Sequence, residues 1–460
     1  MAGAAAAGIV PAGGLAAAGA VITPEAFGAR GDGRTNDTDA FAALSAHVNA
    51  VGGGTIALRP VTYLVGKQFR SRGRKSEFAF IPSDILHFVG CSANLVIRGN
   101  GATLRCAPRL RYGAFDRASG TPLPEGRTNL DIDKRASPYF AMIDVEDCTG
   151  SVDISGIELD GNLRALRLGG KYGKGGWQAP GSGIRMNRNK GPARLSRIHS
   201  HHHPFDGLLL TDSPGRTGST IVSDSVLEFN ARQGCSITSG RNYVFERCAF
   251  RHIGRAGMRS SPAAGVDIEA EASTIRNVTF SNCEFSDNAG FGMVAGSGDS
   301  EGLTFDGCTF VGTTNFAAWP DKPLTRFSNC LFVGAITHTH GDPDPRRAVQ
   351  FLDCTFTDDP GLSPTGEVFV PPSPSSIAVI PNMGNVLFNR CRFTLTGRAL
   401  LPYSTDAIFA DCEMSQRSPA RSSPHGTYLG TTTITGNADL GRSRIRGSVI
   451  LNGRPLPRTA

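Results

Sequence analysis

The sequence lacks a membrane-spanning segment and has little charge. No apolar run reaches about 18 residues with spanning character, which excludes a transmembrane helix. Charged residues make up only 19 % of the 460 residues, and the formal net charge of +7 comes from scattered rather than clustered arginines. No basic motif interleaved with aromatic residues occurs, so we expect neither a nucleic-acid partner nor a membrane span.

The sequence has few tryptophans and no closely spaced pair of cysteines. The chain has two tryptophans and 11 cysteines, with no Cys-x-x-Cys spacing that would indicate a zinc site. Seven cysteines occupy the same position of a repeat, which predicts one inward-facing ladder. Stacked strands are about 4.8 Å apart, slightly too far for an unstrained disulfide, so we expect buried free thiols that pack as small hydrophobic groups.

That repeat is Phe-x-x-Cys-x-Phe, and it organises the middle and C-terminal parts of the chain. Each unit is too short to bury its own apolar face, so the units must stack to form a core. The units are Phe245/Cys248/Phe250, Phe280/Cys283/Phe285, Phe305/Cys308/Phe310, Phe327/Cys330/Phe332, Phe351/Cys354/Phe356, Phe388/Cys391/Phe393 and Phe409/Cys412/Met414, and earlier segments such as Ile154/Ile157/Leu159 keep the pattern with aliphatic residues.

A glycine- and aspartate-rich turn, Phe27-Gly28-Ala29-Arg30-Gly31-Asp32-Gly33, precedes a predicted amphipathic helix. Asn36 or Asp37 can cap this helix, which should run to about Ala50 and stop at the glycines that follow. The segment resembles the N-terminal signature of the pectate-lyase-like superfamily. This resemblance implies a right-handed parallel β-helix that binds a polysaccharide along an outer groove. Hydrolases, lyases, epimerases and phage tailspikes share the signature, so it does not select a reaction.

The predicted fold is therefore all-β: a single-stranded right-handed parallel β-helix of about ten or more coils, with a short N-terminal capping α-helix. We expect one domain over residues 21–460, with loop insertions near 105–140 and 163–182. Residues 1–20 are almost entirely apolar and end in small residues, as in an export signal, but lack its positive start. They predict a flexible tail or the remnant of an export signal, and a periplasmic or secreted protein.

One strand alternates acidic and apolar residues: Gly265-Val266-Asp267-Ile268-Glu269. Period-2 alternation points Val266 and Ile268 into the core and Asp267 and Glu269 outward. Aligning the glycines that begin the equivalent strands predicts an outward row. Its members are Arg185, Leu209, Ser236, Asp267 and Val294.

Asp206 and Gln233 precede the aligned glycines of two earlier coils, and Arg232 lies next to Gln233. We expect Asp206 roughly 10 Å along the axis from the Asp267 strand. Glycoside hydrolysis needs two carboxyl groups, one to protonate the leaving oxygen and one to activate water or to attack. Asp267 and Glu269 are the predicted catalytic pair, with Asp206 as the alternative partner. In the other interpretation these acids bind a structural cation or pair with Arg232 and Arg259.

Further residues are predicted to bind the sugar. Arg232, Gln233 and Arg185 lie near the acids in the predicted register, and Trp177 either stacks on a sugar ring or packs its glycine-rich loop. The histidines at 199 and 201–203 alternate between faces and have no spaced partner motif. They predict a turn that carries one substrate-orienting residue, His203, and no metal site.

Three functions remain open at this stage. The first is a glycoside hydrolase without a cofactor. The second is a lyase on a uronate-containing glycan, with Arg185, Arg232 and Lys174 as candidate groups and a possible Ca²⁺ ion. The third is a non-catalytic glycan-binding or tailspike-like module. Each implies a polysaccharide or oligosaccharide partner, and the chain would be a monomer or a homotrimer. The central coils carry none of the polygalacturonase motifs, and the patterns of the calcium-dependent pectate lyases and alginate epimerases are not recognisable, so no family residues are transferred.

Overall fold

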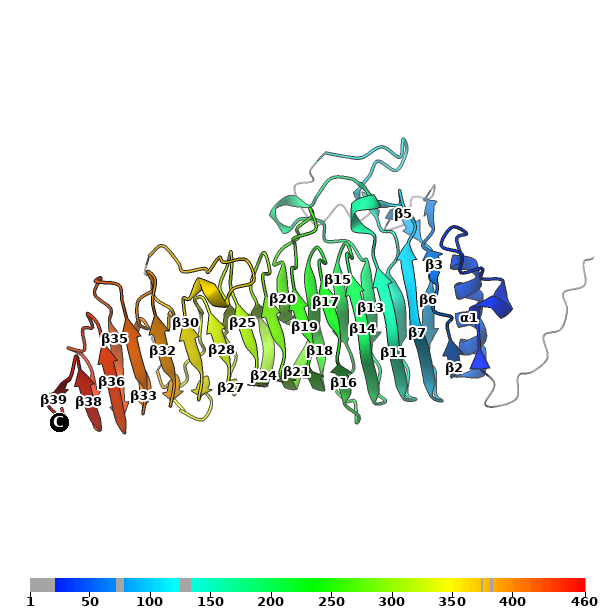
Figure 1. Ribbon diagram of the computed structural model, residues 1–460. Helices are drawn as coiled ribbons and strands as arrows, with labels where there is room; N and C mark the ends of the chain where they lie inside the picture. The colour runs from blue at the N-terminus through cyan, green and yellow to red at the C-terminus, as the bar shows by residue number, and fades with distance from the viewer. Residues whose placement is uncertain (1–20, 72–77, 125–133, 374, 381–383, 460) are drawn as a thin grey trace, which may run out of the picture.

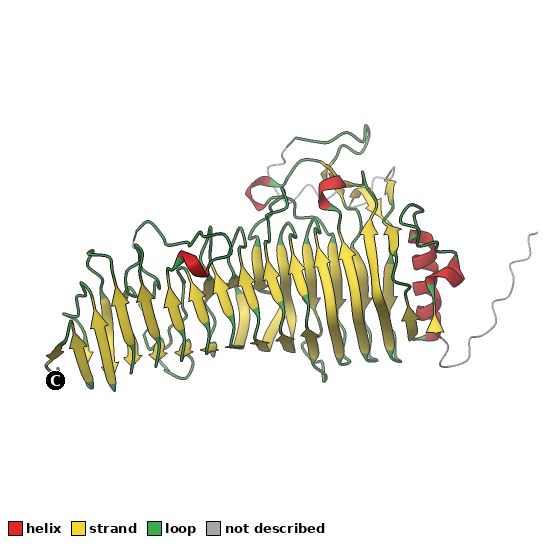
Figure 2. Ribbon diagram, viewed as in Figure 1, coloured by secondary structure: helices red, strands yellow, loops and turns green. Residues whose placement is uncertain are grey.

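The computed structural model describes residues 21–71, 78–124, 134–373, 375–380 and 384–459. Within these ranges the chain forms a long column of stacked strands with one α-helix at its N-terminal end (Figures 1 and 2). The predicted tail of residues 1–20 lies outside the described residues. In the described part of the chain, no helix is long and apolar enough to cross a membrane.

Helix α1 (Thr38–Val51) covers the first coil, as predicted. Asp37 is its N-cap residue, and Gly52, at φ 81°, ends it. Phe41, Leu44 and Val48 are fully buried against the column. A short 3-10 helix, η1 (Pro24–Phe27), precedes it.

The first face of the column is a parallel ladder that runs its whole length. Each strand pairs with its equivalent in the next coil, and the ladder continues without a break from β1 to β37. Its strands are β1 (Val21–Ile22), β2 (Gly54–Ala57), β7 (Leu95–Cys106), β11 (Val152–Asp160), β14 (Ala193–His201), β16 (Thr220–Ser223), β18 (Gln233–Glu246), β21 (Ala270–Ser281), β24 (Gly298–Asp306), β27 (Arg326–Ser328), β29 (Gln350–Leu352), β31 (Leu387–Asn389), β33 (Ser404–Ala410), β35 (Pro424–Leu429) and β37 (Arg444–Ile445).

The second face follows after a sharp corner and forms another parallel ladder. The second halves of β7, β11 and β14 belong to it. An antiparallel strand, β39 (Arg454–Leu456), closes its C-terminal end. The other strands are β3 (Thr62–Val65), β17 (Val226–Glu228), β19 (Ala249–Arg251), β22 (Glu284–Ser286), β25 (Thr309–Val311), β28 (Leu331–Val333), β30 (Thr355–Thr357), β32 (Arg392–Leu395), β34 (Glu413–Gln416), β36 (Thr431–Thr435) and β38 (Ser448–Leu451).

The third face is shorter and lies in the N-terminal half and the middle of the column. It includes the first half of β18. Its other strands are β6 (Leu86–Val89), β10 (Ala141–Glu146), β13 (Ser182–Asn187), β15 (Asp206–Thr211), β20 (Ala264–Ile268), β23 (Met293–Ala295) and β26 (Ala318–Pro320). The three ladders confirm the all-β parallel β-helix with more than ten coils.

The repeated phenylalanines form two stacks inside the column. Phe280 stacks on Phe305 with ring centroids 4.9 Å apart, and Phe285 stacks on Phe310 at 4.5 Å. The two stacks meet edge to face, as Phe280 and Phe285 do at 5.5 Å. A coil in the middle of the repeat thus buries two aromatic rings with partners in both neighbouring coils and beside them, an arrangement that favours one register of stacking.

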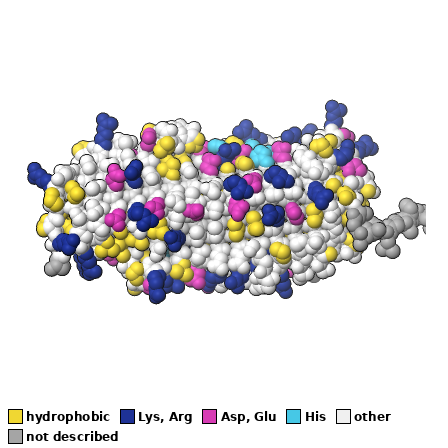
Figure 3. Space-filling model, turned by 60° about the horizontal axis from the view of Figure 1, so that its bottom comes forward, with side chains coloured by type: hydrophobic (Ala, Val, Ile, Leu, Met, Phe, Trp, Pro, Cys, Tyr) yellow, Lys and Arg dark blue, Asp and Glu magenta, His cyan; other side chains and the backbone are white. Residues whose placement is uncertain are grey.

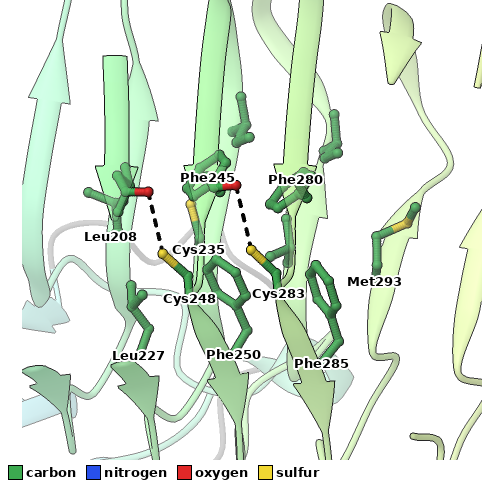
Figure 4. Packing of buried hydrophobic residues seen from close by; sticks show 14 of the residues in the cluster. Leu208, Leu227, Cys235, Phe245, Cys248, Phe250, Phe280, Cys283, Phe285 and Met293 are labelled. Atoms are coloured by element: carbon green, nitrogen blue, oxygen red, sulfur yellow. Dashed lines mark hydrogen bonds between the residues drawn. The ribbon is translucent and has the colours of Figure 1, made fainter. Parts of the chain in front are cut away.

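The seven cysteines of the repeat lie at the corner between the first and second faces. All 11 cysteines of the chain are free and buried, as predicted. The Sγ of Cys283 lies 3.6 Å from the Phe245 carbonyl oxygen of the preceding coil, and Figure 4 shows this contact. Asn282, just before it, has φ 53° and makes the turn. Asparagine tolerates this left-handed conformation better than most residues, so the corner motif combines a turn residue with a small buried thiol.

Part of the insertion predicted near 105–140 is not a loop. Strands β4 (Gln68–Arg70), β5 (Phe78–Pro82), β8 (Arg111–Ala114), β9 (Arg135–Ala136) and β12 (Arg167–Leu168) form a second, small sheet beside the column. Its strands come from three distant segments. The insertion predicted at 163–182 contributes β12 and two 3-10 helices, η3 (Leu163–Ala165) and η4 (Gly173–Gly175). A further 3-10 helix, η5 (Pro360–Leu362), lies on the C-terminal half.

Candidate active site

Strand pairing confirms the outward row predicted on the third face. Ser236 of β18 lies opposite Asp267 of β20, and Asp267 lies opposite Val294 of β23. In the other direction, Leu209 lies opposite Ser236 and Arg185 lies opposite Leu209. The five side chains therefore form one line along the column.

The glycines that begin these strands stack because the coils approach closely there. A Cβ atom on Gly234 would lie 2.5 Å from the carbonyl oxygen of Gly265, and a Cβ on Gly265 would lie 2.5 Å from that of Gly292. No larger residue fits at such a backbone approach. These stacked glycines, called here the glycine ladder, therefore determine the position of Asp267 along the column axis.

Asp267 is a nearly buried carboxyl group in the middle of the row. It is 7 % exposed, and the side-chain amide of Gln233 donates a hydrogen bond to its Oδ2. Burial raises the pKa of Asp267 to about 7, and the nearby charge of Glu269 adds to this rise, while Arg232 and Gln233 oppose it. Near neutral pH, Asp267 can therefore hold a proton and donate it.

Glu269 lies two residues further on and is more exposed. Strand β20 ends at Ile268, and the Glu269 N–H donates to the carbonyl oxygen of Ile237 at 3.0 Å. The Ser297 hydroxyl donates a hydrogen bond to the Glu269 carboxylate. Within the described ranges neither Asp267 nor Glu269 forms an ion pair. The alternative of pairing with Arg232 holds for the third acid, Asp206.

An open pocket of about 480 Å³ lies at these two acids. Phe291 and Trp319 contribute aromatic walls, and their ring centroids are 5.3 Å apart. Trp319 also stacks on His338, at 4.0 Å between centroids. The half-buried indole, held by two aromatic neighbours, can receive the face of a sugar ring beside the carboxyl groups.

Asp206 and Arg232 form a tight ion pair outside the pocket lining. Asp206 is fully buried, and both of its oxygens accept hydrogen bonds from Arg232, at 2.8 and 2.6 Å. The guanidinium also lies 3.7 Å from the ring centroid of Phe205, and Ser236 donates to Asp206 at 2.9 Å. Because Arg232 and Ser236 occupy its oxygens, Asp206 does not face a substrate as predicted. The pair supports the strand next to Asp267.

His203 does not lie on the surface as predicted. Its side chain is fully buried, and its Nδ1 lies 2.9 Å from the Tyr139 hydroxyl. Burial lowers the pKa of His203 well below its usual value, so the ring is neutral. The preceding residue, His202, has φ 56°, which turns the chain and sends the next side chain inward. His203 is a core residue and cannot orient a sugar from this position.

The other predicted substrate-binding residues differ in their placement. Gln233 is fully buried and reaches Asp267, so it positions the acid. Arg185 donates to both oxygens of Asp144 at 2.8 Å, three strands away from Asp267. The Trp177 indole N–H donates to the Gly169 carbonyl at 3.0 Å and packs its loop against the column.

Trp319 is the pocket residue that the sequence alignment missed. It lies opposite Val294 and therefore continues the same outward row. Ala317, just before its strand, stands where the earlier coils have a glycine, so an alignment on glycines ends one coil too early. Placing Ala317 in the glycine position would have revealed it.

Among the described residues, three groups could hold a metal ion, and none includes Asp267 or Glu269. They are Glu158/His199/His201, Asp160/His201/His202 and His87/Asp144/Glu146. The last group is occupied by Arg185, which donates to Asp144 and Glu146.

Comparisons with known proteins agree with the fold. A family model described as a right handed beta helix region matches residues 177–334. No curated protein matches the sequence. A solved N-terminal fragment of gene product 12 of bacteriophage Phi29 is similar at 13 % identity and a TM-score of 0.57, and the match covers 95 % of this chain and 73 % of that one.

Two further solved structures are more distant. The A-module of mannuronan C-5 epimerase AlgE6 from Azotobacter vinelandii has 13 % identity and a TM-score of 0.45, with 94 % of this chain and 98 % of that one covered. An exopolygalacturonase from Thermotoga maritima has 15 % identity and a TM-score of 0.39, with 95 % and 93 % covered. Together with the three parallel ladders, the family match and the phage fragment identify the fold as a right-handed parallel β-helix.

Proposed function

We propose that this right-handed parallel β-helix is a polysaccharide-degrading glycoside hydrolase whose active site is the pocket at Asp267 and Glu269. The observation that carries the proposal is the pair of unlike carboxyl groups. Asp267 is almost buried with a pKa raised to about 7, and Glu269 is more exposed and lies two residues away. Two carboxyl groups in different environments are what acid-assisted glycoside hydrolysis requires.

In the proposed reaction, Asp267 is the general acid. It donates its proton to the glycosidic oxygen as the bond to the anomeric carbon breaks, so the leaving sugar departs as a neutral alcohol. The Gln233 amide holds Oδ2 of Asp267 and orients the carboxyl group.

Glu269 is the second carboxylate. It either removes a proton from the attacking water or attacks the anomeric carbon itself, and Ser297 orients it by a hydrogen bond. Trp319 offers the stacking surface that holds a sugar ring over the two acids. Both acids line the same pocket of about 480 Å³, which leaves room for a glycosidic bond beside them.

The contacts of the arginines favour hydrolysis over the lyase alternative. A lyase needs a cationic group to neutralise the uronate before the C5 proton is removed. Arg185 and Arg232 are each held by two hydrogen bonds to an aspartate, and neither lines the pocket.

The test is digestion of a broad glycan panel by the full chain, followed by mass spectrometry and a reducing-end assay. We expect new reducing ends without an unsaturated product. Asp267→Asn and Glu269→Gln should each lower turnover by at least 100-fold, since general acid–base catalysis contributes about that much or more. Glu284→Gln on β22 of the second face is the matched control and should retain full activity.

Three outcomes would contradict the assignment. Near-normal turnover in both active-site variants would remove the carboxylates from the reaction. Products with ultraviolet absorbance would indicate elimination, and glycan binding without any product would favour the non-catalytic module.

A further inference from the structure

The second face carries a cluster of histidines and carboxylates that the proposed reaction does not use. Strands β11 and β14 pair so that Glu158 lies opposite His199 and Asp160 lies opposite His201. Leu159 and Ser200, between them, are buried, so their neighbours point outward. Figure 3 shows histidine side chains gathered beside acidic ones on one face of the column.

Three of these side chains converge closely. Glu158, His199 and His201 each offer a ligand atom, and these atoms lie within 4.8 Å of one another. His201 Nε2 is already 3.0 Å from Glu158 Oε1, and the two imidazole rings have centroids 4.2 Å apart. Ligand atoms around a tetrahedral zinc ion are about 3.3 Å apart, so small side-chain rotations would complete the site.

We propose that Glu158, His199 and His201 bind a divalent first-row transition-metal ion such as Zn²⁺. Two imidazoles and one carboxylate form a donor set that suits such ions better than Ca²⁺ or Mg²⁺, which prefer oxygen ligands. No partner motif near these histidines predicts the site, because the carboxylate comes from the neighbouring coil, 41 positions earlier than His199.

The surroundings of Glu158 leave its charge free for a cation. Its Oε2 accepts a hydrogen bond from the Thr103 hydroxyl at 2.7 Å, and its one ion-pair partner in the described part of the chain is His201. The two neighbouring carboxylates are each neutralised by an arginine. Asp160 pairs with Arg105 at 2.8 Å, and Glu228 pairs with Arg251 at 2.9 Å. The uncompensated carboxylate is therefore the one that faces both histidines.

Glu228 supports the site from the other side. Its Oε1 lies 2.9 Å from His199 Nε2. A carboxylate on a ligating histidine orients the ring and increases its basicity, a common feature of metal sites. His199 is 43 % exposed and Glu158 37 % exposed, so the ion would keep open positions for water or a sugar hydroxyl.

The overlapping group Asp160/His201/His202 is the weaker candidate. The carboxylate of Asp160 is engaged by Arg105 and by the backbone N–H of Asn162. The Nδ1 atoms of His201 and His202 lie 2.7 Å apart and satisfy each other by a hydrogen bond. This difference makes the two ligand sets distinguishable by mutation.

The test uses the full chain without a polyhistidine tag, stripped of metal by a chelator and titrated with ZnCl₂. We expect one ion per chain by calorimetry. His199→Ala, His201→Ala and Glu158→Gln should each weaken Zn²⁺ binding by at least tenfold. Co²⁺ should give visible absorption bands that these variants lose.

His252→Ala is the matched control, because His252 directly follows β19 as His202 follows β14, and it pairs with Asp287. It should bind Zn²⁺ within twofold of the wild type, as should His202→Ala. Circular dichroism and the melting temperature of each variant would report whether it folds. Absence of stoichiometric Zn²⁺ binding by the wild type, unchanged binding in His199→Ala, or loss of binding in His202→Ala would overturn the proposed ligand set.

Discussion

At the scale of single residues, Asp267 shows how one buried carboxyl group connects catalysis with stability. Its pKa rises from an ordinary value of 3.8 to about 7 because the side chain is almost out of contact with water. The folded state therefore binds this proton more tightly than the unfolded state does. The resulting stabilisation is complete below about pH 4 and is lost as the pH rises to about 7.

Asp267→Asn should therefore make the protein more stable above pH 7, where the wild type carries a buried charge. The expected difference in the free energy of unfolding is up to about 4 kcal/mol, from roughly three pKa units. It should shrink towards zero near pH 4. Melting temperatures of both proteins from pH 4 to 8 would check this, with Asp306→Asn, an exposed position, as the control. Equal pH profiles for Asp267→Asn and the wild type would contradict the raised pKa.

Alternation predicted the directions of Asp267 and Glu269, because both follow a glycine that is locked in register. Other arguments placed Asp206, by its position before an aligned glycine, and His203, by the turn that carries it, and both residues are buried. His202 has positive φ, and alternation holds only while the backbone is extended, so the direction of His203 could not be read from residue spacing. Asp206 is buried because Arg232 and Ser236 cover it, and these contacts depend on the neighbouring coil.

At the scale of elements, the glycine ladder determines how closely neighbouring coils pack at the pocket. Gly265→Ala would bring a Cβ to 2.5 Å from the Gly292 carbonyl and 3.1 Å from that of Phe250. Both contacts are backbone atoms that cannot rotate away. We expect a loss of about 1–3 kcal/mol in stability, as for other overpacked sites. Displacement of Asp267 should also lower activity.

Gly215→Ala is the comparison, since its nearest neighbour would be the Ser213 hydroxyl at 3.8 Å. It should melt within about 1 °C of the wild type, as surface substitutions are usually close to neutral. Chemical denaturation of the two variants would separate a steric effect from the general cost or benefit of an added methyl group. Equal stability of Gly265→Ala and Gly215→Ala would show that neighbouring coils can move apart to accommodate the added methyl group.

The strands of the column could be predicted because their side chains repeat from coil to coil. In the middle of the series a phenylalanine such as Phe310 has an equivalent residue directly on both sides, in Phe285 and Phe332. The strands of the small sheet beside the column show no such repeat in the sequence. Its strands pair residues as distant as Arg111 and Arg167, and each is too short for a pattern to emerge.

At the scale of the whole molecule, the column has two ends that must be closed. Helix α1 covers one end, with Leu44 fully buried among the first strands. Leu44→Glu would place an unpaired charge against the first coil and expose a strand edge that other chains could pair with. We expect self-association, measured by light scattering during size-exclusion chromatography. Ala46→Glu, on the exposed side of the same helix, should stay at the wild-type size.

The corner thiols have a consequence for the redox behaviour of the protein. Each is buried inside the column and out of contact with solvent. At Cys412, burial raises the pKa to about 12, so the reactive thiolate of this residue is essentially absent at neutral pH. The folded protein should therefore resist oxidants that react with exposed cysteines. The unfolded chain exposes all 11 thiols at once. Oxidation of these thiols is therefore expected only before folding is complete, and the folded column protects them.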